Sequence, residues 1–357
     1  MGDPEHGTPD SRVRMRHART VAVRLVGLLL SLIAVLVLVN SVDLAETARY
    51  LGSADARLLV AAGAVVFGQL AVVTLRWSFL LPSAARGRVG WAALLRPVSL
   101  GYLGNFLLPA RLGELIRAAY INRRWRIPMA PTIGSVILER VLDTAVLGVV
   151  AFGLAILLGA PGWVIQVAAV AAAAGLAIVG VLAGGVGIPL ARWLEGRVGR
   201  AQAVGRVLGS FLAGAGPSRR GAVVPAALLS AVSWTMEGIV YWMAATAVGL
   251  DIPVGVALLV AAITVLATAI PAAPAYVGTF ELAVTVGAGA FGVPPAAALA
   301  WGVVAHAITV LPLMLAGVVA LGTTGARFGE LVEEARSAQE DADGLASPGA
   351  TSWTDGT

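Results

Sequence analysis

The sequence predicts an all-α polytopic membrane protein, and three observations carry this prediction. First, 58% of the 357 residues are hydrophobic and only 13% are charged, whereas charged residues make up about 25% of a soluble domain. Second, several apolar stretches exceed the roughly 20 residues that a helix needs to cross a bilayer. Third, Arg gathers in some of the connecting loops and is missing from others. We predict about six full spans and two broken or re-entrant helical hairpins.

Six apolar stretches are long enough to cross the membrane as helices. The first follows a basic segment, residues 1–20, and its apolar part is longer than the 7–15 residues of a signal peptide, so we expect it to stay uncleaved. The predicted spans are residues 21–41, 58–82, 130–158, 163–190, 222–248 and 295–321. Residues 21–322 then form a single transmembrane domain. The tail, residues 323–357, is acidic and expected to be disordered.

The distribution of Arg predicts the orientation of the chain. The N-terminal segment and three loops, around residues 83–90, 117–126 and 191–221, are rich in Arg, whereas the loops near residues 160 and 250 contain none. By the positive-inside rule, the Arg-rich segments face the cytoplasm. We therefore expect a multi-pass protein of the cytoplasmic membrane with both termini in the cytoplasm.

Two apolar regions are interrupted by Pro and Gly. Residues 96–117 have basic flanks on both sides, which predicts a hairpin that dips in from the cytoplasm and returns. Residues 254–291 are predicted as a hairpin from the external face or, alternatively, as two short spans. The motif PARLG at 109–113 matches PAYVG at 274–278. Broken elements in corresponding positions that enter from opposite faces indicate an inverted-repeat transporter.

The turns of the two hairpins are expected at the prolines and glycines of this shared motif. Pro fits the first turn of a helix, where a missing N–H costs nothing. The free N–H groups of a helix that starts near Pro109 would also contribute to an anion site. The predicted structural turn residues are Pro109, Gly113, Pro274 and Gly278.

Polar side chains follow the first hairpin turn at regular spacing. Arg111, Glu114 and Arg117 are three residues apart, so they project from one side of a helix. Glu114 can pair with either Arg, which leaves one positive charge unmatched. Asn105 lies in the same hairpin and either caps its broken backbone or contacts a ligand.

The third predicted span contains the sequence ERVLD. Glu139 and Asp143 are four residues apart on one helical face, with Arg140 beside them. Each charge inside a span costs a few kcal/mol on insertion scales, so it needs a partner. We expect these residues to meet the Arg-bearing hairpin and to line a polar cavity in which guanidinium groups hold a phosphate. The alternative is a purely structural network that locks the helices together.

Three further polar residues lie at membrane depth. Glu237 is a lone acid in the fifth span and His306 is a lone His in the last one, and both are candidates for proton coupling or for a simple bond to a neighbour. Glu281 follows the second hairpin turn as a counterpart of Glu114. The predicted substrate-binding residues are Asn105, Arg111, Glu114, Arg117, Glu139, Arg140, Asp143 and Glu281.

Several functions are excluded or disfavoured by the sequence. There is no Cys, which excludes disulfides, thiol catalysis and Cys-based metal sites. There is no Walker loop, GxSxG, HExxH or Gly-rich dinucleotide fingerprint. The net charge of +5 is explained by basic loops on a membrane protein, so we expect no nucleic-acid partner. We also expect no enzyme activity, no cofactor and no metal.

Three motifs point to a family. GNFLLPARLGELIRA, ERVLDTAVLG and PAAPAYVGTFELA, in this order, resemble the flippase-like transmembrane region of the lysylphosphatidylglycerol synthases over residues 20–322. In two-part members of that family, the membrane region is thought to move a lipid between leaflets, and a separate soluble domain makes the aminoacyl lipid. This sequence has no such domain, so the resemblance implies a stand-alone membrane member. Its PAPAYVG segment departs from the Gly-rich turn that is usual in the family.

Three hypotheses for the function remain open. The preferred one is a flippase for a phosphate-bearing lipid or lipid-linked precursor, such as a phospholipid or a polyprenyl-phosphate sugar carrier. The second is a secondary transporter of a small anionic solute with the same polar cavity. The third is a non-transporting membrane partner of an envelope-synthesis enzyme. The expected partner is therefore a membrane lipid and, in the third case, that enzyme.

Overall fold

The computed structural model describes residues 9–85, 87–108, 112–184, 187–197, 205, 209, 220–268, 272–325 and 327–346. The prediction of an all-α polytopic membrane protein is confirmed. Within these residues, five helices are long and apolar enough to cross a membrane, or six if α1 and α2, which are bent by 92° relative to each other, form one span. Strands are absent from the same part of the chain.

The long helices match the six predicted apolar stretches. Their bounds are α1 Pro9–Ser41, α3 Ala56–Leu80, α6 Met129–Leu157, α7 Gly162–Gly184, α10 Arg220–Ala247 and α13 Pro295–Thr324. The shorter helices are α2 Leu44–Gly52, α4 Leu95–Leu107, α5 Gly113–Trp125, α8 Gly187–Glu195, α11 Val254–Ala267, α12 Thr279–Gly289 and α14 Phe328–Ala346. Three 3₁₀ turns are η1 Ser83–Ala85, η2 Trp91–Leu94 and η5 Pro274–Tyr276.

The order of helix lengths occurs twice along the chain. In the first half, α3 to α6 have 25, 13, 13 and 29 residues. In the second half, α10 to α13 have 28, 14, 11 and 30 residues. The short helices are about 16–21 Å long at 1.5 Å per residue, less than the roughly 30 Å of a hydrocarbon core. Each half therefore consists of two long helices that enclose a broken pair.

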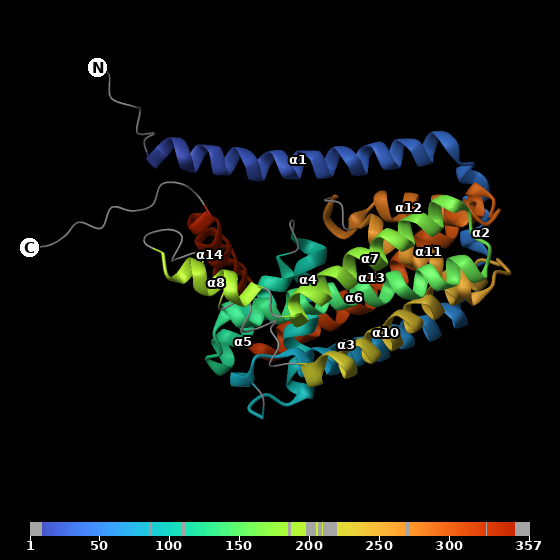
Figure 1. Cartoon of the computed structure of the whole chain (residues 1–357). Helices are drawn as coiled ribbons and strands as arrows, with labels where there is room; N and C mark the ends of the chain where they lie inside the picture. Colours follow the sequence, from blue (N-terminus) through green and yellow to red (C-terminus); the bar gives the residue numbers. More distant parts are fainter. Residues whose placement is uncertain are drawn as a thin grey trace, which may run out of the picture.

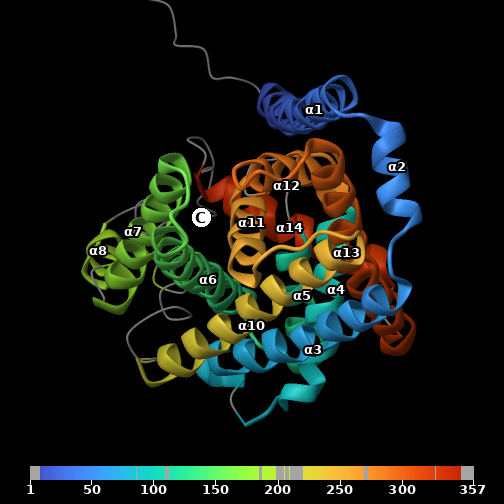
Figure 2. The ribbon, with the colours of Figure 1, turned by 90° about the vertical axis from the view of Figure 1, so that its right-hand side faces the viewer.

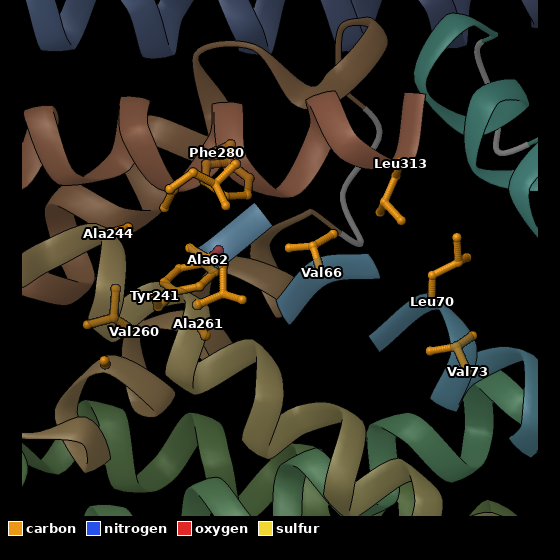
Figure 3. Close-up of a cluster of buried hydrophobic side chains, with 14 of the residues drawn as sticks. Ala62, Val66, Leu70, Val73, Tyr241, Ala244, Val260, Ala261, Phe280 and Leu313 are labelled. Atoms are coloured by element: carbon orange, nitrogen blue, oxygen red, sulfur yellow. The ribbon is translucent and has the colours of Figure 1, made fainter. Parts of the chain in front are cut away.

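The two halves interlock around the α3–α10 pair. These two helices run side by side, as Figure 2 shows. Each broken pair also contacts the other half, because α4 packs against α13 and α11 packs against α6. The buried cluster between them is rich in alanine, and Figure 3 labels Ala62, Ala244 and Ala261, which are at most 1% exposed. The same cluster also holds Trp77 and Trp301. Small residues let helix backbones approach closely, which is the main source of packing between helices in lipid.

Helix α1 lies along one side of the bundle and meets it through one narrow stripe (Figure 1). Ala34 and Leu38 are buried, whereas most large apolar side chains between residues 25 and 39 are about half exposed. That exposure suits a helix whose outer face contacts lipid. At its end the chain turns sharply because Asp43 caps α2, where its side chain accepts from Ala45 N at 2.9 Å and Glu46 N at 3.0 Å.

Part of the acidic tail, residues 328–346, is helical. Residues 328–346, which we expected to be disordered, form α14, and α14 packs against α5. Leu331 and Ala335 are fully buried against Ile116 and its neighbours. Arg123 on α5 forms an ion pair with Glu330 at 2.6 Å. The acidic composition did not indicate that this segment is an amphipathic helix, whose single apolar face is enough to pack against α5.

Candidate functional site

The ERVLD residues lie at the centre of a buried charge cluster on α6. Glu139 is fully buried and Asp143 is 6% exposed. Because they are four residues apart, both carboxylates point from the same face of α6. That face is turned toward α3, α5 and α10. The cluster comprises six charged residues: Arg76, Glu114, Arg117, Glu139, Arg140 and Asp143.

Arg76 on α3 is the innermost cation of this cluster, and the sequence analysis missed it. Its side chain is 2% exposed and donates to Glu139 Oε1 at 2.8 Å. It also forms an ion pair with Asp143 and donates to Ser230 Oγ at 3.1 Å. Ser230 in turn donates to Asp143 Oδ1 at 3.0 Å. The available signal was a single Arg inside the second apolar stretch, since an intramembrane charge is a functional candidate by default.

Arg117 on α5 binds the other carboxylate oxygen of Glu139. The distance from Arg117 Nη2 to Glu139 Oε2 is 2.9 Å. The guanidinium carbon lies 4.0 Å from the centre of the Trp77 ring, which adds a cation–π contact. Trp77 is fixed by a 3.1 Å bond from its Nε1 to Ser135 Oγ. Glu139 thus bridges two arginines that come from different helices.

Arg140 and Glu114 form the outer layer of the cluster. Arg140 Nε lies 3.1 Å from Glu114 Oε1, and the two side chains are 35% and 21% exposed. Arg140 is also 4.0 Å from both Glu139 and Asp143. Of the two partners expected for Glu114, Arg117 instead turns inward to Glu139, and Glu114 faces Arg140 on α6, whereas Arg111 lies outside the described residues. The first broken pair and the ERVLD residues are brought together as predicted, but with different partners.

The charges of this cluster balance within the described residues. Three arginines face three carboxylates, and each arginine lies within 3.1 Å of at least one of them. The Nε atoms of Arg76 and Arg117 are buried and have no hydrogen-bond acceptor in the described chain. Within the described residues the cluster therefore has no surplus charge, but it retains buried donors without an acceptor, which are uncommon in a folded protein.

The break between α4 and α5 is held by backbone contact at a glycine. A Cβ at Gly113 would overlap the Gly101 carbonyl oxygen and the Asn105 backbone, so only Gly fits there. Asn105 Oδ1 accepts from Gly113 N at 3.0 Å. Asn105 therefore caps α5, and one of the N–H groups proposed for an anion is already used. Pro109 and Arg111 lie outside the described residues, so their predicted roles remain predictions.

The second broken pair contains its own polar pair, which the sequence analysis did not connect. His306 Nδ1 on α13 lies 2.6 Å from Glu281 Oε1, and His306 Nε2 lies 2.7 Å from the Ala275 carbonyl oxygen. The other carboxylate oxygen, Glu281 Oε2, accepts from Gly278 N at 2.7 Å and caps α12. Glu281 is therefore the counterpart of Asn105 and not of Glu114, because its side chain caps α12 as the Asn105 side chain caps α5.

The turn before α12 has a strained backbone. Ala275 and Tyr276 have φ values of 53° and 62°, which are rare for residues with a side chain. Such conformations cost about 1–3 kcal/mol each and persist only where the surroundings impose them. Gly278 has a φ of 85° and lies against α1, with no room for a Cβ beside the Ser31 carbonyl. Pro274 begins η5 and is exposed.

Glu237 lies apart from both clusters. It is 7% exposed and accepts from Gln69 Nε2 on α3 at 2.9 Å. The acid that looked alone in the sequence is thus bonded across the α3–α10 pair. No group of three or more His, Cys, Asp or Glu suited to a metal occurs in the part of the chain that the structure describes.

These features define a class of protein: a polytopic α-helical membrane protein with two broken helix pairs, each of which carries a buried polar cluster. The chain belongs to the family described as lysylphosphatidylglycerol synthase TM region, which matches residues 24–317. The resemblance found in the three sequence motifs is therefore confirmed. No solved structure was found to match the chain.

One curated relative is similar along most of the chain. It is the glycosyltransferase AglD of Haloferax volcanii, which is 28% identical over 368 residues, 92% of this chain and 58% of the relative. The chain thus spans a little under three fifths of that protein's length. The expectation that this chain has no enzyme activity is contradicted, because a relative of this coverage carries the name of an enzyme.

Proposed function

We propose that this protein is a translocase that moves a phosphate-bearing lipid or lipid-linked precursor between the leaflets of the cytoplasmic membrane. The observation that carries the proposal is the layered cluster at the first broken pair. Its outer ion pair, Arg140 with Glu114, is partly exposed, and its inner arginines, Arg76 and Arg117, are buried behind it. Membership of a family named for a lipid synthase supports a lipid as the substrate.

The cluster can accept a phosphate by exchanging partners. A phosphate that approaches Arg140 replaces the Glu114 carboxylate, which is exposed enough to turn toward solvent. The guanidinium group then presents two parallel donors to the phosphate oxygens. The unused Nε donors of Arg76 and Arg117 provide further sites at greater depth. In this way the head group crosses a polar path while its acyl chains stay in lipid. Arg111 remains a second candidate ligand, as the sequence indicated.

The orientation of the two halves is part of the proposal. With both termini in the cytoplasm, the broken pair α4–α5 enters from the cytoplasm and the pair α11–α12 enters from the external face. The matched helix lengths of the two halves support this inverted repeat. In such transporters the substrate site lies where the two repeats meet near the bilayer midplane.

The test is lipid movement in proteoliposomes that contain phosphatidylglycerol with a fluorescent acyl chain. Dithionite added outside bleaches the outer leaflet at once and the inner leaflet only as lipid is moved. We expect the wild-type protein to accelerate the slow phase and Arg140→Lys to reduce that rate about tenfold, since Lys keeps the charge but loses the paired donors. Arg123→Lys is the matched control, because Arg123 also pairs with acids but lies outside the cluster. Equal rates for the two variants would contradict the proposal.

A second candidate function is glycosyl transfer to a lipid carrier. The name of the Haloferax volcanii relative favours it. It is tested by supplying the purified protein with a radiolabelled nucleotide sugar and a polyprenyl phosphate. Label that enters the lipid fraction, and that depends on the protein, would support catalysis; an unlabelled lipid fraction together with active lipid movement would support translocation alone.

A further inference from the structure

The contact between Glu281 and His306 fixes how many protons the pair holds. The Ala275 carbonyl oxygen, 2.7 Å from His306 Nε2, is only an acceptor, so Nε2 must carry a hydrogen. The 2.6 Å contact between His306 Nδ1 and Glu281 Oε1 then needs one more hydrogen between its two atoms. That hydrogen belongs either to an imidazolium beside a carboxylate or to a neutral imidazole beside a carboxylic acid. In both forms the pair is neutral overall.

Loss of this hydrogen breaks the arrangement. The neutral ring then has one N–H for two acceptors, so either Nδ1 faces the carboxylate or Nε2 faces the Ala275 carbonyl oxygen without a hydrogen, and the pair carries one negative charge. His306 is 8% exposed, so such a charge is poorly solvated. The ring, which also stacks on Phe280 at 4.3 Å, must move to relieve the repulsion, and its bond to Ala275 is lost with it.

Among the described residues, no second cation is paired with Glu281 in place of the proton. No described residue other than His306 forms an ion pair with Glu281. The described parts of α1, α11, α12 and α13 that hold or adjoin the pair carry no other charged side chain. The titratable groups of the remaining packed elements are Glu46, Arg49 and Tyr50 on α2, Arg57 and Arg76 on α3, Arg96 and Tyr102 on α4, Glu237 and Tyr241 on α10, and Tyr276 in η5.

The turn that the pair holds, η5, has a strained backbone. The backbone of Ala275 and Tyr276 adopts left-handed conformations, which it leaves when its restraints are removed. Besides His306, those restraints include the 2.9 Å bonds from Ala273 N to Ser31 Oγ and from Thr279 Oγ1 to the Tyr276 carbonyl. Release of one restraint therefore loosens η5 and the start of α12, where they touch α1 and α4.

We propose that Glu281 and His306 form a binding site for one coupling proton, whose release to water opens the second broken pair. The inference rests on the proposed translocase function, because the proton would be exchanged for lipid movement. With the proton bound, the net charge of the pair is zero and η5 is docked. With the proton released, the charge is −1 and η5 is loosened because it loses its bond to His306. A lipid translocase with this site responds to a pH difference across the membrane.

The first test measures the opening alone and needs no lipid movement. Ala283, 8% exposed on α12, is replaced by Cys in this naturally Cys-free chain, and its labelling rate by a water-soluble maleimide is measured across pH. The rate is divided by that of Val277→Cys, which is 53% exposed and reports the thiol's own pH dependence. We expect this ratio to rise about tenfold with pH. In a Glu281→Gln background it should stay flat, because the amide keeps both hydrogen bonds without a titrating proton.

The second test connects the proton to transport. In proteoliposomes, the fluorescent-lipid rate should change about tenfold with an imposed pH difference, and Glu281→Gln should abolish that dependence. Glu237→Gln is the control, since Glu237 is a buried acid whose hydrogen bond within the described residues comes from Gln69 on α3, and it should leave the dependence intact. A ratio of labelling rates that is flat in the wild-type pair overturns the proton site. A protein that opens with pH yet moves no lipid would instead overturn the translocase function. A rate of lipid movement that is the same with and without the pH difference would overturn the proton coupling.

Discussion

The first half, α3 to α6, and the second half, α10 to α13, use different chemistry at corresponding places. Each joins its second short helix to its second long helix by a polar contact: Arg117 with Glu139 at 2.9 Å, and Glu281 with His306 at 2.6 Å. Arg keeps its charge at any physiological pH, whereas a His–Glu pair can give up a proton. This difference is the basis of our two proposals, an anion site in the first half and a proton site in the second.

The two halves also differ in how firmly the pair is supported. Glu139 is bound by Arg76 as well as Arg117, and Arg76 is bound in turn to Asp143 and Ser230. Within the described residues, the further hydrogen-bond partners of the Glu281–His306 pair are backbone atoms of Gly278 and Ala275. We infer that the first cluster is the fixed centre of the molecule and that the second is its moving part.

The largest expected effect concerns the opposite orientation of the halves. Arg124 at the end of α5 and Asp251 before α11 are both exposed, and each marks the rim of one broken pair. Cys at position 124 should be labelled by an impermeant maleimide only from the cytoplasmic side, and Cys at position 251 only from the external side. Labelling of both positions from the same side of oriented vesicles would show that the two broken pairs do not enter from opposite faces of the membrane.

The next largest effect concerns how much the first cluster contributes to the unfolding free energy. Glu139→Ala strands Arg117 and removes one partner of Arg76, so we expect a loss of about 3–5 kcal/mol in unfolding free energy, as for other broken buried pairs. Arg117→Ala with Glu139→Ala should recover part of it. The control Glu330→Ala breaks an ion pair whose side chains are 42–45% exposed and should cost less than about 1 kcal/mol. Equal losses in thermal unfolding for the two single variants would mean that the cluster is not a stabilising centre.

A smaller effect tests the docking of η5 against α1. Gly278 and Gly292 both have positive φ, 85° and 81°, but only Gly278 has neighbours that a Cβ would meet. Gly292→Ala should therefore cost only about 1 kcal/mol for its backbone, and Gly278→Ala about 2–3 kcal/mol in all. The difference in melting temperature between the two variants measures the contact with α1. Equal melting temperatures for the two variants would mean that Gly278 is not in close contact with α1.

The fold was largely readable from the sequence, since membrane spans follow from hydropathy. The prediction for residues 130–158 differs by one residue at each end from α6. The broken pairs were located because Pro and Gly interrupt apolar runs. The docked helix α14 was missed because tail composition says little about a face of three or four apolar residues.

The partners within the site were harder to predict. The four-residue spacing of Glu139 and Asp143 showed that they share a helical face. It could not show that Arg76 on α3, which is 63 residues from Glu139 in the sequence, binds them in the fold. Spacing offered Glu114 two nearby partners, Arg111 or Arg117, whereas packing of α5 against α6 places it beside Arg140. Glu281 and His306 each looked alone, because a contact between residues on different helices leaves no mark in either local sequence.

The most direct test of the central claim is native mass spectrometry of the protein purified with its lipids. We predict that the wild-type protein and Arg123→Lys retain a phosphate-bearing lipid and that Arg140→Lys loses most of it while its melting temperature stays close to that of the wild type. Arg111→Lys, measured in the same way, tests the second candidate ligand. A lipid that stays bound at wild-type levels to both Arg140→Lys and Arg111→Lys would contradict the account and leave the buried charges as a lock between helices.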